Sequence, residues 1–184
     1  MFHSYLDTPI GRLLLVSDGE VLIEIHFESD GQPVAAPPDS RADDTALAQA
    51  ARELSEYFSG RRRSFEVAIG FRRGTEFQRE VWQALRDIPF GTTISYGELA
   101  RRVRRPNGFR AVGAANGRNP LPIVVPCHRV IGSDGTLTGF GGGLPTKQHL
   151  LQLEGCAIAA RAISGPGRHH PVPSRVSNGA DGRG

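Results

Sequence analysis

The sequence predicts an α+β protein in which a small sheet domain precedes a helical domain with a helix-turn-helix. Strand-like segments fill the first 30 residues, whereas apolar residues recur at helical spacing from Gly74 onward. The last part of the chain is rich in Gly, Pro, Ser and Arg without any periodicity, which is typical of disorder. We therefore expect an N-terminal α+β domain over residues 1–72, a helical C-terminal domain over residues 73–156 and a disordered basic tail over residues 157–184.

A β-hairpin is expected near the start of the chain. Residues 10–17 and 20–27 are rich in branched apolar side chains, which favour strands. Asp18 and Gly19 lie between them and form a strong hairpin-turn signal. The two segments should therefore pair as neighbouring antiparallel strands.

One helix and one further strand are expected after a polar loop that contains several prolines. Asp43 or Asp44 is placed to cap the helix. Its apolar positions at helical spacing are Leu47, Ala50, Leu54, Tyr57 and Phe58. Gly60 ends this helix, and the alternating residues 64–71 predict a strand. This half of the chain carries no obvious catalytic set.

Short helices dominate the second half. Thr75 should cap a helix that ends near residues 89–91. Its apolar face consists of Phe77, Val81, Trp82 and Leu85. Ser95 and Glu98, three residues apart, predict a capping box at the start of the next helix. A final helix is expected over residues 146–154, packing inward through Leu150, Leu151 and Leu153.

Residues 105–108 should break the helix that follows Ser95, so that another begins near Phe109. Two short helices joined by a tight, glycine-containing turn resemble a helix-turn-helix. The second of them has very little side-chain bulk, because it contains Ala111, Gly113, Ala114 and Ala115. Such a helix can approach a DNA groove closely, or it can pack tightly into a core. The arginines between residues 101 and 118, with no acidic residue among them, favour the DNA interpretation.

Composition is that of an ordinary globular protein, with 39% hydrophobic and 22% charged residues. No apolar run reaches the roughly 18 residues of a membrane span, and the N-terminus lacks a signal-peptide pattern. With 2 cysteines the chain has no disulfide framework. We therefore expect a cytoplasmic protein without a membrane partner. Acidic residues outnumber basic ones before residue 70, and the reverse holds for residues 71–155, so a polyanionic partner would bind the second half.

The stretch IVVPCHRVIG, residues 123–132, places Cys127 and His128 side by side after an apolar run. A nucleophilic cysteine needs a neighbour that removes its proton. Adjacent side chains do not face each other, so His128 would act through a bridging water, and Glu154 would orient the imidazole. On these residues alone, a structural cysteine at the end of a strand is an equally good interpretation.

These motifs together resemble a known family. PCHRVI follows RAVGAANGRNPLPIVV and precedes GFGGGLPTKQHLLQLEG. The combination closely resembles the O6-alkylguanine-DNA alkyltransferases, the methylated-DNA–protein-cysteine methyltransferases. The resemblance is dense from Thr75 to Gly155 and looser over the N-terminal strands, which fit the family's small ribonuclease H-like domain. The tail after Cys156 has no recognisable counterpart.

The resemblance implies a catalytic set of five residues. Cys127 would accept the alkyl group from the O6 atom of a damaged guanine. His128 would act as its base through a water, and Glu154 would orient the imidazole. Tyr96 would give a proton to the departing base. Asn119 would brace the turn around the site through hydrogen bonds.

A further set of positions would bind the DNA and the flipped base. Arg110 would enter the base stack in place of the guanine, and main-chain groups near Val130 and Gly141 would read the guanine edge. The other binding positions implied are Ser95, Ala111, Arg129 and Phe140. Family members often carry tyrosine and serine at Phe140 and Gly141, so the substrate range of this chain is open.

The implied activity is irreversible, single-turnover transfer of the alkyl group from O6-alkylguanine in double-stranded DNA to Cys127, after base flipping. O4-alkylthymine is left open as a second substrate. The resemblance implies a monomer without a cofactor. Some relatives bind a structural zinc through N-terminal Cys and His, but the N-terminal half here has no cysteine, so we expect no metal.

Two other functions compete with repair. A non-catalytic lesion sensor would carry another residue, commonly tryptophan, in place of Cys127. A helix-turn-helix transcription regulator would need side chains that read bases, and the alanine- and glycine-rich helix offers few of them. DNA binding should instead be mainly electrostatic, through Arg101, Arg102, Arg104 and Arg105. Both arguments favour repair.

Overall fold

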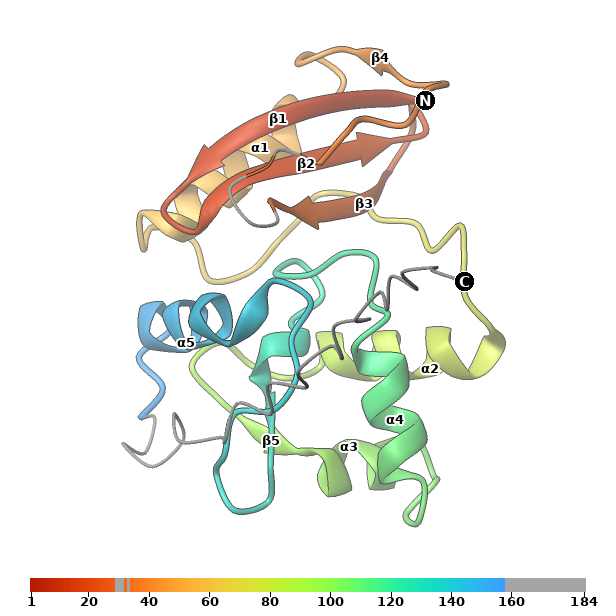
Figure 1. Ribbon diagram of the computed structural model, residues 1–184, viewed down its shortest axis with the longest axis vertical. Helices are drawn as coiled ribbons and strands as arrows, with labels where there is room; N and C mark the ends of the chain where they lie inside the picture. Colours follow the sequence, from red (N-terminus) through yellow and green to blue (C-terminus); the bar gives the residue numbers. More distant parts are fainter. Residues whose placement is uncertain (29–31, 33, 158–184) are drawn as a thin grey trace, which may run out of the picture.

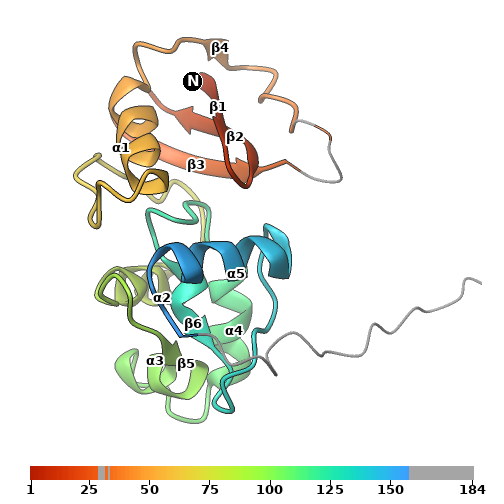
Figure 2. The ribbon, with the colours of Figure 1, turned by 90° about the vertical axis from the view of Figure 1, so that its left-hand side faces the viewer.

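The computed structural model describes residues 1–28, 32 and 34–157 of the chain. They form a sheet half, covered on one face by a helix, and a helical half next to it (Figure 1). The edge strand β3 is the strand nearest the helical half in both views (Figure 2). The expected α+β architecture is therefore confirmed. The expected tail lies, from residue 158 onward, outside the described residues.

The sheet has four strands in the order β3-β2-β1-β4. β1 (Phe2–Thr8), β2 (Gly11–Ser17) and β3 (Leu22–Phe27) pair antiparallel, and the short β4 (Arg41–Ala42) pairs with β1 in parallel. β2 lies between two strands and is buried from Leu13 to Ser17, because Leu13 and Leu15 pack in the main core and Leu14 and Val16 in a second, smaller cluster. The expected hairpin of β2 and β3 is confirmed, whereas β4 had no signal in the sequence.

The sheet's helix, α1 (Ala48–Phe58), begins later than its expected cap. Its N-cap is Leu47, and no side chain caps it. Asp43 instead accepts hydrogen bonds from the backbone N–H groups of Thr45 and Ala46, so it stabilises a turn before the helix. Asp44 accepts a hydrogen bond from the Ser4 hydroxyl. The capping prediction for both aspartates is therefore wrong, because nearer partners occupy their side chains.

The strand expected over residues 64–71 does not form. This segment makes one isolated bridge, between Ile69 and Leu22. The backbone N–H groups of Glu66 and Val67 donate to the buried carboxylate of Glu53, at 2.8 and 3.1 Å, and so are not available to a neighbouring strand. The alternation in the sequence reflects side chains that pack on the core rather than strand pairing.

Three helices follow in the helical half. α2 (Glu76–Arg86) begins with the expected cap at Thr75, whose hydroxyl accepts from the Gln78 backbone. α3 (Tyr96–Arg102) begins at Ser95, which accepts from the Glu98 backbone at 3.0 Å. The carboxylate of Glu98 pairs with arginines of the same helix, so only half of the expected capping box is present. α4 (Phe109–Asn116) follows a turn over residues 103–108.

Two short parallel strands and a last helix complete the helical half. β5 (Ile94–Ser95) pairs with β6 (Val130–Ile131), and the 3-10 turn η1 (Cys127–Arg129) directly precedes β6. α5 (Gly143–Leu153) begins three residues before the predicted start. Gly143 adopts a φ of 83°, a left-handed conformation that glycine reaches without steric cost, and this turns the chain into the helix.

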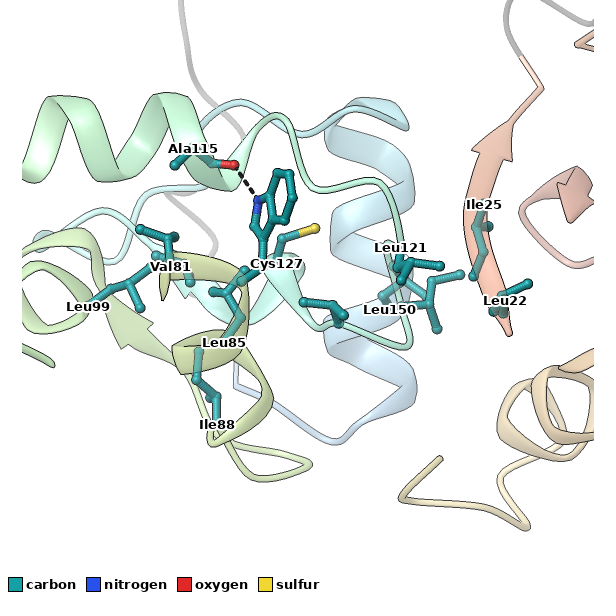
Figure 3. Packing of buried hydrophobic residues seen from close by; sticks show 14 of the residues in the cluster. Leu22, Ile25, Val81, Leu85, Ile88, Leu99, Ala115, Leu121, Cys127 and Leu150 are labelled. Carbon is teal, nitrogen blue, oxygen red and sulfur yellow. Dashed lines mark hydrogen bonds between the residues drawn. The ribbon is translucent and has the colours of Figure 1, made fainter. Parts of the chain in front are cut away.

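One hydrophobic core joins the two halves. In Figure 3 it extends from the helical half through Cys127 to β3, and the labelled side chains along it include Val81, Leu85, Leu99, Leu121, Leu150, Ile25 and Leu22. The indole N–H of Trp82 donates to the carbonyl of Ala115 at 2.8 Å, which links α2 to α4 inside this core. None of the helices among the described residues is long and apolar enough to cross a membrane.

Candidate active site

A braced turn carries Cys127 into the core. The side chain of Asn119 donates to the carbonyl of Val125 at 2.7 Å and accepts from the backbone N–H of Leu121 at 3.0 Å. Ile123 in this turn has a φ of 75°, a strained conformation for a β-branched residue. Asn119 therefore holds a tight turn that delivers the cysteine at its end.

The thiol of Cys127 is almost completely buried, with 4% of the residue exposed. Burial raises its pKa, because the thiolate loses solvation, and the Asn119 side chain and the charge of Lys147 oppose this only in part. The resting group is therefore a neutral thiol at pH 7. A reaction at this sulfur would need a base to remove its proton.

His128 is placed to be that base. Its Nε2 lies 2.9 Å from Oε1 of Glu154, and the imidazole is fully buried. Burial lowers the pKa of His128, against the effect of Glu154, so the ring is neutral. An ionised Glu154 only accepts hydrogen bonds, so Nε2 carries the proton and Nδ1 has the free lone pair. Among residues 1–28, 32 and 34–157, no atom serves as a hydrogen-bond partner of Nδ1.

Glu154 is held ionised by several donors. Arg129 donates to both carboxylate oxygens, at 2.8 and 2.9 Å, and the Tyr57 hydroxyl donates to Oε1 at 2.8 Å. The backbone N–H of Gly91 reaches Oε2 at 3.1 Å. Burial alone would raise the pKa of Glu154, but the bonds from His128 and Arg129 outweigh it and lower the pKa to about 2. The imidazole of His128 is therefore hydrogen-bonded to a carboxylate that stays ionised at neutral pH.

Arg129 is buried, whereas the resemblance implied that it binds DNA or substrate. Only 6% of the residue is exposed, and its guanidinium is occupied by Glu154 and by the carbonyl of Ile88. The expected DNA or substrate contact for Arg129 is therefore wrong. A buried carboxylate needs a matched cation, and Arg129 supplies it.

An outer pocket lies next to the thiol, between α4 and the loop that follows β6. It is lined by Tyr96, Phe109, Gly113, Gly117 and residues 138–141. Burial raises the pKa of Tyr96, although the nearby side chains of Thr138 and Asn116 oppose the shift. The phenol therefore keeps its proton at pH 7, and Tyr96 lines the outer pocket.

An inner cavity of about 230 Å³ contains Cys127 in its wall. It shares Gly117, Gly139, Phe140 and Gly141 with the outer pocket. Val130 is fully buried, and its carbonyl accepts a hydrogen bond from Lys147 Nζ at 2.6 Å. The structure therefore brings Cys127, Phe140 and Gly141 together around one space, with Tyr96 in the adjoining outer pocket, whereas Val130 lines neither of the two.

The outer face of the two short helices is open. On α4, Arg110, Ala111 and Ala114 are exposed, whereas Val112, Ala115 and Asn116 are buried. Small residues therefore allow close packing inward and leave a shallow surface outward, and the approach of this helix to DNA stays a prediction. Arg101, Arg102, Arg104 and Arg105 are exposed at the end of α3 and in the following turn. Ser95 is half-buried and serves as the cap of α3.

Two residues near the site were missed from the sequence. Lys147 is fully buried and donates to the carbonyls of Val130 and Thr138, so it ties β6 to the pocket loop. Burial lowers its pKa to about 8, although nearby Cys127 opposes this shift. Tyr57 comes from α1 in the other half of the chain. No local pattern distinguishes a buried lysine from a surface one, and Tyr57 was counted only as a core position.

Within the part of the chain that the structure describes, no group of three or more His, Cys, Asp or Glu side chains is arranged to hold a metal ion.

Comparison with known proteins supports the resemblance seen in the motifs. Residues 1–71 match the ribonuclease-like domain of 6-O-methylguanine DNA methyltransferase, and residues 76–156 match its DNA binding domain. A methylated-DNA–protein-cysteine methyltransferase from Methanosarcina acetivorans is 44% identical over 155 residues, covering 84% of this chain and 99% of the relative. One from Haemophilus influenzae is 46% identical, with 84% and 86% covered.

Solved structures agree with this assignment. The crystal structure of Mycobacterium tuberculosis OGT in complex with DNA aligns with a TM-score of 0.77 at 44% identity, covering 84% of this chain and 92% of that chain. An O6-methylguanine-DNA methyltransferase from Pyrococcus kodakaraensis aligns with a TM-score of 0.60 at 26% identity, covering 83% and 98%. Both halves of the sequence, and the fold that joins them, show that this chain belongs to the 6-O-methylguanine DNA methyltransferase family.

Proposed function

We propose that this chain repairs O6-alkylguanine in double-stranded DNA by moving the alkyl group irreversibly to Cys127. The observation that carries this proposal is the position of the thiol. It lines a cavity that shares Gly117 and residues 139–141 with the outer pocket, and it is followed directly by a neutral imidazole with a free Nδ1. The similar protein from Methanosarcina acetivorans is a methylated-DNA–protein-cysteine methyltransferase, which supports the proposal.

The proposed reaction is a direct displacement at carbon. His128 Nδ1 takes the proton of the Cys127 thiol through a bridging water, and the ionised Glu154 stabilises the imidazolium that forms. The sulfur attacks the carbon attached to O6, so that an S–C bond forms as the C–O bond breaks. The electron pair of the C–O bond goes to the guanine, and Tyr96 supplies the proton that the base regains. The proton held by His128 then returns through water to the Tyr96 oxygen, so that both side chains end neutral and the thiol proton has passed to the guanine. No cofactor enters the balance.

Single turnover follows from the product. A thioether is a poor target for water, and its formation removes the nucleophile that would be needed again. Cys156, the other cysteine, packs against Leu137 and Leu151 in a separate small cluster. We therefore propose that each molecule acts once.

Base flipping follows from the burial of the thiol. The O6 atom of a stacked guanine cannot reach a sulfur that lies inside the core, so the nucleotide must leave the duplex. The shallow outer face of α4 lies beside the outer pocket and allows the duplex to approach closely. Arg110 is exposed on the first turn of this helix, where it can occupy the space that the base leaves.

Transfer should stop at one group per chain. When the protein is mixed with an excess of duplex containing O6-methylguanine, we expect the amount of restored guanine to rise quickly and then stay at one equivalent of protein. Nuclease digestion and chromatography of the nucleosides measure this amount. Continued release of guanine beyond one equivalent would contradict the proposal, and so would no release at all.

Replacing Arg110 with alanine should separate DNA handling from chemistry. We expect the transfer rate on duplex O6-methylguanine to fall by at least about tenfold, because the flipped state loses the side chain that fills the stack. The rate with free O6-benzylguanine should change less than twofold. Arg118→Ala is the control, since Arg118 is an exposed arginine just after α4. Equal losses on both substrates would contradict the role of Arg110.

A further inference from the structure

Phe109 is an exposed aromatic residue at the edge of the outer pocket. It is the first residue of α4, and 51% of it is exposed. Among the residues that the structure describes, it belongs to none of the apolar clusters that form the core. The ring therefore contributes little to the packing of the folded chain and is open to contact from outside.

The ring lies on the side of α4 that lines the outer pocket. Phe109, Gly113 and Gly117 follow one another at intervals of four residues, which places them along one side of the helix, and all three line the pocket. The two glycines add no side chain to this wall. Among the residues placed around this pocket, Phe109 is therefore the one that brings a side chain from α4.

Aromatic rings and backbone line the rest of the outer pocket. Besides α4, the lining consists of Tyr96, Thr138, Gly139, Phe140 and Gly141. A Cβ on Gly113 would lie 3.6 Å from the Tyr96 ring, so this ring packs against the backbone of α4. Tyr96 and Phe140 also pack on the main core. Three aromatic side chains thus surround the space, and nucleobases stack favourably on such rings.

The surroundings of Phe109 are positively charged. The guanidinium carbon of Arg110 lies 5.8 Å from the centre of the Phe109 ring, within the range of a cation–π contact. The segment from Arg101 to Arg118 contains no acidic residue. A strand that brings a base to the ring therefore finds cations for its phosphates on the same surface. Proteins bind unpaired nucleotides with this combination of cations and exposed aromatic rings.

We infer that the Phe109 ring stacks on the alkylated base when the base occupies the outer pocket, so that this residue binds the extruded nucleotide. The inference rests on the proposed transfer to Cys127 and adds a residue that holds the substrate. Arg110 occupies the place that the base leaves in the duplex, whereas Phe109 contacts the base after it has left. Only the role of Arg110 therefore needs a second strand.

The first test compares the same O6-methylguanine lesion in a duplex and in a short single strand. The second-order rate of methyl transfer is measured with protein in excess. Phe109→Ala should lower this rate at least about fivefold on both substrates, because the base loses its stacking partner in both. Arg110→Ala should lower the rate on the duplex and change it less than about twofold on the single strand.

A series of side chains at position 109 separates stacking from apolar packing. Phe109→Tyr and Phe109→Trp keep a ring, so their rates should stay within about twofold of the wild-type rate. Phe109→Leu keeps an apolar side chain without a ring and should behave like Phe109→Ala. The control is Leu144→Ala, which should change neither rate. Leu144 is an apolar residue of α5, 42% exposed, that does not line the outer pocket.

Fluorescence reports the contact directly. The chain has 1 tryptophan, the buried Trp82, so Phe109→Trp adds a single indole at the pocket. In a protein that also carries Cys127→Ala, the emission of this indole should fall when the lesion duplex is added, because it stacks on the base. The same duplex with ordinary guanine should cause a smaller change. Cys127→Ala alone is the reference for the emission of Trp82.

Several results would overturn the inference and leave the proposed function standing. They are unchanged rates in Phe109→Ala, a loss confined to the duplex, and equal rates for Phe109→Leu and Phe109→Tyr. An indole signal that is the same for the lesion duplex and the ordinary duplex would also overturn it. Transfer from neither substrate by the wild-type protein would mean that the proposed function itself fails.

Discussion

Replacing Cys127 with alanine should abolish alkyl transfer completely while the protein still binds lesion-containing DNA. The sulfur is the acceptor in the proposed reaction, and the other cysteine, Cys156, does not line the cavity that Cys127 lines. The structural cost should be small, about 1 kcal/mol, because a single buried atom is removed. Transfer is measured with duplex carrying a radiolabelled methyl group, and binding is measured by fluorescence anisotropy with the same duplex.

The control for this variant is Cys156→Ala. Cys156 is half-buried in a separate cluster, and its loss should leave the transfer rate unchanged. Label retained on the Cys127→Ala protein would contradict the account, because it would identify another acceptor. Loss of lesion binding together with transfer would indicate that the substitution disturbed the pocket rather than the chemistry.

Glu154→Gln should reduce both the stability and the rate. The variant leaves Arg129 as a buried cation without its anion, which costs about 3 kcal/mol in the free energy of unfolding. It also removes the anion that stabilises the protonated His128, so we expect the single-turnover rate to fall at least about 100-fold. Urea unfolding and rapid-quench transfer measure the two effects separately.

The pH dependence of stability gives a second readout for Glu154. Its pKa is lowered from 4.5 to about 2 in the folded protein. A lowered carboxyl pKa contributes stability above the unfolded value, and this contribution is lost as the pH falls from about 4.5 towards 2. The Glu154→Gln variant should therefore lose less stability than the wild type over this range.

Glu53→Gln is the matched control for Glu154→Gln. Glu53 is also a buried carboxylate, but its hydrogen-bond partners are Gln49 and the backbone N–H groups of Glu66 and Val67, and Arg62 lies 3.8 Å from it, all far from His128 in the sequence. This variant should lose stability and, where it is folded, keep the wild-type transfer rate. Equal rate losses in both variants would contradict the role of Glu154 behind His128.

The elements with local signals were predicted well from the sequence. The β2–β3 hairpin, the cap at Thr75 and the break before α4 each depend on a few neighbouring residues, and all are present. The strand at residues 64–71 failed because a distant carboxylate, Glu53, takes its backbone donors. A periodic pattern shows which side chains face the core, but it does not show where the backbone hydrogen bonds go.

The site residues that lie in local motifs were also predicted, whereas those that come from distant segments were not. The Cys127-His128 pair and Glu154 came from motifs, and the structure brings His128 and Glu154 into contact. Arg129 was misplaced because a surface arginine and the buried partner of a carboxylate look alike in the sequence. Tyr57 and Phe27 lie 70 or more positions before the cysteine, and only the folded chain brings them to Glu154 and to the cavity.

The most direct test is the intact mass of the protein after incubation with a duplex that carries one O6-methylguanine. Our account expects a gain of about 14 Da, the mass of a methyl group replacing a proton, on every active chain and never more than once. Peptide mapping should place the added group on Cys127. An unchanged mass, or a methyl group mapped to any other residue, would contradict the claim that Cys127 is the acceptor.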